Sequence, residues 1–138
     1  TEMIEAVYIA ILTLLKDNVT INSSIVPVSS LSLSDANYSI QMLSYNANPT
    51  SNKVSKIKNL VVNIDCVVKN GTQDELASMV QQVEDLIKPE VNSKLELGAS
   101  YHIIWMKDPI YLNYEDEMDG GKFVRHTTLR YEMEIQTL

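Results

Sequence analysis

The chain has 138 residues, a length that fits one domain and leaves little room for two. Its 45% hydrophobic and 21% charged residues are ordinary for a folded domain, and the net charge of −7 argues against tight nucleic-acid binding, which needs clustered Lys and Arg. The single cysteine, Cys66, cannot form an internal disulfide and lacks the partners that a zinc site or redox pair would need.

The opening segment, from about Glu2 to Lys16, is predicted to be a helix. Its apolar residues recur at helical spacing, and the apolar face that they form extends almost all round the helix. This pattern is typical of a helix covered by its own sheet and by a neighbour as well. Glu2 and Glu5 stand where a signal peptide would carry positive charge, and the segment is shorter than the roughly 20 residues that cross a bilayer. We therefore expect a buried helix and no membrane partner.

Residues 17–37 are rich in Ser and Asn, so we expect a loop there with at most one short strand. The segment from Tyr38 to Met42 alternates as a strand does. Residues 46–56, NANPTSNKVSK, contain turn formers and no periodicity, which predicts a long mobile hairpin tip. We assign Lys53, Lys56 and Lys58 to a flexible loop, which either aids solubility or contacts an acidic partner.

The segment from Ile57 to Val68 is apolar on one face and half apolar on the other, which favours a strand inside the sheet. A second helix should follow the Asn70-Gly71 turn, because Thr72 and Glu75 have the spacing of a capping box and Pro89 ends the pattern. Its apolar face must dock on the sheet, and it consists of Leu76, Met79, Val80, Val83, Leu86 and Ile87.

The last third of the chain is predicted to be β-structure. Residues 101–106 alternate, Pro109 interrupts them, and a strand continues from Ile110 to Tyr114. The acidic stretch 115–121, EDEMDGG, is expected to be a hairpin loop. From Phe123 to Ile135 the chain alternates again, in a strand of roughly 45–50 Å at about 3.4 Å per residue, two to three times the usual length.

This order of elements predicts an α+β fold in a single domain over residues 1–138. Two helices would pack on one face of a mostly antiparallel β-sheet that ends in the long C-terminal strand.

No catalytic constellation can be assembled, so we predict no enzyme, no cofactor and no metal. His102 and His126 each lack a nearby carboxylate motif or second histidine, although meeting across the sheet would let them bind a metal. Cys66 suits a small apolar core position. The acidic stretch lacks the spacing of a calcium loop. Four aromatic residues could form a base-stacking platform but lack adjacent positive charge, which favours core or interface packing; they are Tyr101, Trp105, Tyr111 and Tyr114.

The long terminal strand is expected to outgrow its own sheet and to offer unpaired backbone groups to another copy of the chain. Its outer face carries charges of both signs, which suit a subunit contact. The residues that we assign to this interface are Arg125, Leu129, Arg130, Tyr131, Glu132 and Glu134.

The order of elements also resembles a known family, the tail terminator or tail completion proteins of long-tailed bacteriophages. The likeness covers nearly the whole chain, and it is carried by the segments IEAVYIAILTLLKD, LVVNIDCVV, TQDELASMVQQVEDLI and GGKFVRHTTLRYEMEI. The Asn- and Ser-rich segment from Ser23 to Asn37 is longer than that pattern, which leaves another neck protein, such as a head-completion or stopper protein, as an alternative.

The resemblance implies a virion protein, assembled in the bacterial cytoplasm, that forms a ring of commonly six subunits. The ring would cap the tail tube at its head-proximal end, stop tube polymerisation and dock the head connector or stopper protein. DNA would pass through without specific binding, which an acidic chain suits. We hypothesise that the acidic set lines the channel or contacts a neighbouring ring; its members are Glu115, Asp116, Glu117 and Asp119.

Two readings from other classes remain open. A small intracellular ligand-binding or enzyme domain would gather His102, Trp105 or Asp65 in a pocket between helices and sheet. An adaptor would use the loop from Lys53 to Lys58 to bind an acidic partner.

Overall fold

The structure is a computed structural model, and it describes residues 2–29, 36–49, 57–88, 95, 97–118 and 122–138. The helices are α1 (Glu2–Leu15) and α2 (Gln73–Leu86). The strands are β1 (Thr20–Ile21), β2 (Ser24–Ile25), β3 (Val28–Ser29), β4 (Tyr38–Pro49), β5 (Ile57–Lys69), β6 (Tyr101–Met106), β7 (Ile110–Met118) and β8 (Lys122–Thr137). The predicted α+β class, with its long C-terminal strand, is confirmed.

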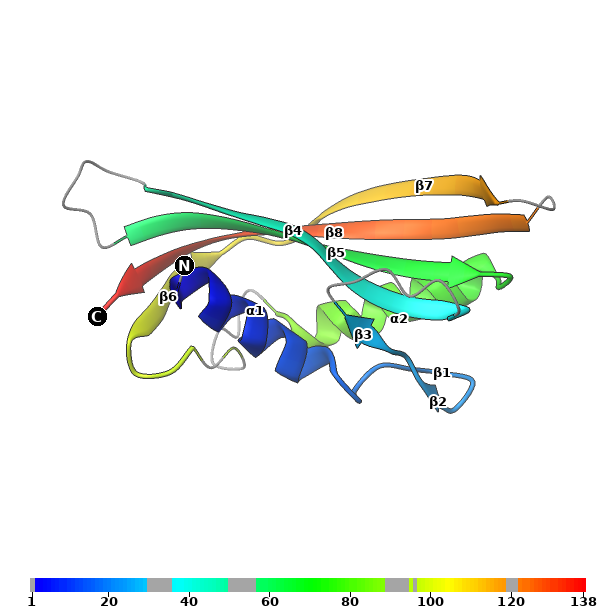
Figure 1. Cartoon of the computed structure of the whole chain (residues 1–138), viewed down its shortest axis with the longest axis horizontal. Coiled ribbons are helices and arrows are strands. Elements are labelled where there is room, and N and C mark those ends of the chain that lie inside the picture. Colours follow the sequence, from blue (N-terminus) through cyan, green and yellow to red (C-terminus); the bar gives the residue numbers. More distant parts are fainter. Residues whose placement is uncertain (1, 30–35, 50–56, 89–94, 96, 119–121) are drawn as a thin grey trace.

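The main sheet is long, twisted and mostly antiparallel (Figure 1). Its order is β3-β4-β5-β8-β6, and β7 also pairs with β8. β5 lies inside the sheet, between β4 and β8, as its two apolar faces predicted. Only the short β3–β4 pair is parallel among the pairs of this sheet that the structure describes.

β6 and β7 lie in series along the same side of β8. β7 pairs with residues 122–130 of β8 and β6 with residues 133–137. Pro109 stands at the break between them, where a residue without an N–H ends a ladder. The backbone N–H of Lys107 still donates to the carbonyl of Glu132 at 2.9 Å, so the chain follows β8 across the interruption.

Both helices lie on one face of the sheet (Figure 1). Val7, Ile11 and Leu15 of α1 are buried, as are Leu76, Met79 and Val83 of α2. The sheet contributes a continuous buried surface beneath them, made of Ile40, Leu60, Val62, Ile64, Cys66, Leu129, Tyr131, Met133 and Ile135. Cys66 is the small core residue that its position predicted, and burial raises the pKa of its thiol.

The predicted helix boundaries are confirmed to within a residue or two. Thr72 is the N-cap of α2, and the capping box with Glu75 is present. α1 buries one face as predicted, while the opposite side leaves Ile9 53% exposed. Neither helix in the described part of the chain is long and apolar enough to span a membrane.

Three sequence-based boundaries were wrong because strand pairing extends beyond the local apolar pattern. Residues 17–37 hold the three short strands β1, β2 and β3 instead of at most one. β4 runs on to Pro49, so residues 46–49 of the predicted hairpin tip are strand, and Lys58 belongs to β5, paired with Pro49 and Ile135. β7 continues to Met118, so most of the predicted acidic loop is strand.

Candidate assembly surface

The terminal strand β8 is an inner strand, which corrects the prediction that it offers a free edge. β5 pairs with it on one side, and β7 and β6 pair with it in series on the other. Leu129 and Tyr131 are fully buried, and the Tyr131 hydroxyl donates to the carbonyl of Ile87 at 3.4 Å. These two side chains fill the core of the chain and are not interface residues. The strand is long because two strands in series pair along it.

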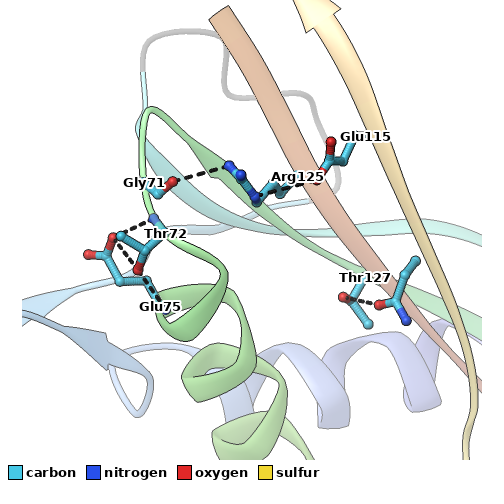
Figure 2. A network of polar contacts seen from close by, with 7 residues as sticks. Gly71, Thr72, Glu75, Glu115, Arg125 and Thr127 are labelled. Atoms are coloured by element: carbon cyan, nitrogen blue, oxygen red, sulfur yellow. Dashed lines mark hydrogen bonds and ion pairs between the residues drawn. The ribbon is translucent and has the colours of Figure 1, made fainter.

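Two more of the predicted interface residues are held by contacts within the chain. Nη1 of Arg125 donates to the carbonyl of Gly71 at 3.3 Å, and its Nε lies 3.5 Å from Oε1 of Glu115 (Figure 2). Glu132 accepts from Nδ2 of Asn59 at 3.0 Å and pairs with Lys107 at 3.4 Å. The hydrogen bond from Asn59, and then Lys107, lowers the pKa of Glu132. Both side chains therefore stabilise the sheet.

The remaining two predicted interface residues lie on the sheet face away from the helices. Arg130 is exposed and lies opposite Ile110 of β7. Glu134 is half-buried and lies opposite Trp105 of β6.

The edge on this side of the sheet is β7, which pairs with β8 alone in the described part of the chain. Ile110 is 67% exposed and Leu112 is 62% exposed. They lie opposite Arg130 and Thr128, so both stand on the sheet face away from the helices, where no described helix lies (Figure 1). Large apolar side chains on an uncovered edge favour association with another chain.

Two further apolar residues of this hairpin are exposed on the helix side of the sheet. Phe123 is 52% exposed near the start of β8. Tyr111 lies beside α2, where partial burial and then a hydrogen bond with Glu84 raise the pKa of Tyr111 to about 12. We call Ile110, Tyr111, Leu112 and Phe123 the β7–β8 apolar edge.

The hairpin that carries this edge is fixed to the start of α2. Arg125 joins β8 both to Glu115 of β7 and to Gly71, just before the helix cap (Figure 2). Position 71 needs glycine, because a Cβ there would overlap the side chain of Val68. A second link across the hairpin comes from Thr127, whose hydroxyl donates to Oδ1 of Asn113 at 2.6 Å.

The cap itself joins three parts of the chain through Glu75. The Thr72 N–H donates to Oε1 of Glu75 at 2.8 Å, and the Glu75 N–H donates to the Thr72 hydroxyl at 3.2 Å (Figure 2). The Tyr38 hydroxyl donates to Oε2 at 2.6 Å, and Nδ2 of Asn22 donates to the same oxygen at 3.0 Å. These hydrogen bonds, with that of Tyr38 the largest cause, lower the pKa of Glu75.

A polar cluster beside the edge was missed in the sequence. Asp65 is almost fully buried on the sheet face away from the helices. Its Oδ2 lies 2.8 Å from Nδ1 of His126. Its Oδ1 accepts from the Thr128 hydroxyl at 3.1 Å. The ring of His126 stacks on that of Tyr114 in β7, with centroids 4.4 Å apart. The sequence contained one signal of this cluster, the carboxylate of Asp65 within the apolar run LVVNIDCVV. A charge buried in such a strand needs hydrogen-bond donors from other residues.

The predicted acidic and basic sets are placed only in part. Glu115 is half-exposed and paired with Arg125, and the backbones of Asp116 and Glu117 pair with β8. Asp119, Lys53 and Lys56 lie outside the described residues.

The pocket expected for a ligand-binding or enzyme domain is not assembled from the residues named for it. His102 and Trp105 lie opposite Gln136 and Glu134, whereas Asp65 lies opposite Thr128, about 20–27 Å further along β8. Two hollows of about 380 and 410 Å³ occur in the described surface, and none of these three residues lines either.

The two histidines do not meet, because His102 lies opposite Gln136 whereas His126 is itself in β8, ten positions away. Across the described ranges, no group of three or more His, Cys, Asp or Glu side chains is placed to hold a metal ion. The four aromatic residues considered as a stacking platform are also dispersed, since Tyr114 pairs near the hairpin end of β8 and Tyr101 near its other end.

Comparison with known proteins adds no family assignment, since no protein-family model and no curated protein matches this chain.

Proposed function

We propose that the chain is the subunit of a ring that ends a phage tail tube at its head-proximal end and joins the tail to the head connector or stopper protein. The observation that carries the ring is the β7–β8 apolar edge, an exposed strand edge with large apolar side chains. Isolated chains with such an edge aggregate, whereas closed rings bury it.

The support for this ring comes from β7, because β8 is paired on both sides within the chain. The edge is held on a hairpin fixed to α2 through Arg125, so it is presented in one orientation. A preorganised edge loses little conformational entropy on association. On the opposite side of the molecule, Ile9 of α1 is also exposed, and a ring stacked on a tube needs further contacts of this kind.

The charge of the chain agrees with a channel that lets DNA pass. A net charge of −7 presents like charge to phosphate, so the ring would not retain the DNA by electrostatic attraction. The tail tube protein, the connector or stopper protein and other copies of this chain are the proposed partners, and the virion is the proposed location.

The experiment is co-expression of this chain with a candidate tail tube protein from the same genome, followed by electron microscopy of the tubes. We expect tubes of limited length that carry a ring at one end, and unlimited growth without the chain. The matched variants are Leu112→Glu and Ala77→Glu, the second on the exposed side of α2. Leu112→Glu should abolish the limit on tube length, whereas Ala77→Glu should preserve it.

Tubes of the same length distribution with and without the wild-type chain would contradict the terminator role. Rings that bind purified connector but ignore tubes would reassign the chain to a head-completion or stopper role.

A further inference from the structure

The two edges of the main sheet run in opposite directions. β4 is antiparallel to β5, β5 to β8, and β8 to β7, so three reversals separate β4 from β7. When copies are related by rotation about an axis along the strands, each keeps its strand direction. β7 of one copy then meets β4 of the next as an antiparallel pair, the geometry with the stronger ladder.

The outer side of β4 is available for such a pair from Met42 onward, and across the sheet Ser44 stands level with Ile110 of β7. β3 pairs only with Ile40 and Gln41, at the start of the strand. Beyond a β-bulge between Met42 and Ser44, β4 continues to Pro49 with β5 as its single strand neighbour in the described chain. Bulges increase local twist and bend a strand, and a sheet that closes on itself needs such curvature.

The β7 edge lacks the usual protection where its side chains are most exposed. Strand edges are normally blunted by charges, prolines or bulges. In β7 the acidic residues are confined to its far end, from Glu115 onward, while Ile110, Tyr111 and Leu112 carry no charge. The contact should therefore centre on residues 110–112.

We infer that β7 of one copy pairs with β4 of the next, so that the main sheet continues from subunit to subunit around the ring. This inference rests on the proposed ring, and it adds which two strands form the contact between neighbouring subunits. A second copy of the chain is the occupant that the geometry favours, because one head-to-tail contact uses both edges of every subunit. A two-fold β7–β7 contact would cover only one edge and leave every β4 open.

Paired cysteines test the contact. Register places positions 44, 46, 110 and 112 on the sheet face away from the helices. Within one copy, β4 and β7 are three strand spacings apart, about 14 Å, which is too far for a disulfide that needs Cα atoms about 4.4–6.8 Å apart. Cys66 is fully buried and does not compete.

The double variants Ser44→Cys/Leu112→Cys and Ser44→Cys/Ile110→Cys are oxidised mildly and separated under denaturing, non-reducing conditions. We expect at least one of them to give a ladder of covalent oligomers that stops at the ring size. Leu112→Cys alone should stay monomeric on the gel, and Ala77→Cys/Leu112→Cys should give no ladder. If the substitution at 112 prevents folding, Ile110→Cys replaces it.

Each contrary outcome has a separate meaning. A dimer from Leu112→Cys alone would establish the two-fold contact and overturn the inference. Rings visible by electron microscopy without any ladder would also overturn it while leaving the proposed function intact. Monomers throughout, with no rings, would overturn both.

Discussion

Nδ1 of His126 lies 2.8 Å from Oδ2 of Asp65, a carboxylate that is almost fully buried on the sheet face without a helix. The two residues are far apart in sequence but adjacent across β5 and β8, beside the apolar edge. The Thr128 hydroxyl supplies a second donor to this carboxylate. These two contacts therefore offset the cost of burying the Asp65 carboxylate.

Replacing His126 by Ala should destabilise the fold by about 1–3 kcal/mol, because a buried acceptor loses a donor. Urea unfolding of His126→Ala, Asp65→Ala and the double variant gives the free energy of the interaction as a double-mutant cycle. The double variant should lose clearly less than the sum of the single losses, since the two residues share one interaction. Strict additivity would contradict the hydrogen bond as a stabilising contact.

Thr72→Ala should destabilise the fold by about 1 kcal/mol, because the N-cap hydroxyl that accepts from the Glu75 N–H is lost. Thr13→Ala is the matched control, since Thr13 lies on the exposed side of α1 and its hydroxyl bonds only within its own helix among the described contacts. Equal losses in thermal or urea unfolding would contradict the capping role.

The contribution of Glu75 should depend on pH. Its pKa is lowered from 4.5 in the folded chain, so its stabilising contribution is present above about pH 4.5 and is lost as the pH falls through the lower folded value. Glu75→Gln should therefore be less stable than the wild type at pH 7, and the difference should shrink toward pH 3. Urea unfolding at several pH values checks this, and a difference that stays constant would contradict it.

Adjacent residues of β8 should respond very differently to truncation. Leu129→Ala should cost about 2–5 kcal/mol, because it opens a cavity in the core, whereas Arg130→Ala should cost less than about 0.5 kcal/mol. Urea unfolding of the two variants separates a core position from a surface one. Small losses of stability of similar size in both variants would instead place Leu129 at a subunit interface.

The local elements were predictable and the strand order was not. The capping box and the apolar spacing of α2 depend on residues within one turn or two, and the alternation of β8 is also local. Whether a long strand is an edge depends on which distant segments pair with it. The break at Pro109 concealed that β6 and β7 together match the length of β8.

The candidate site was less predictable than the fold for the same reason. Arg125, Leu129 and Tyr131 were assigned to an interface on the assumption that β8 lies at the edge. The residues that do lie at the edge, Ile110 and Leu112, follow a proline in a short apolar run that also suits a core strand. Only the pairing of β7 with β8 on one side distinguishes the two cases.

Sedimentation velocity across a range of concentrations tests most directly whether other copies cover the exposed edge of β7. We expect the 15.6 kDa chain to sediment as a closed oligomer, with six copies the proposed number, and Leu112→Glu to sediment as the monomer while Ala77→Glu stays assembled. A wild-type chain that remains monomeric up to hundreds of micromolar, with or without tail tubes, would contradict the ring.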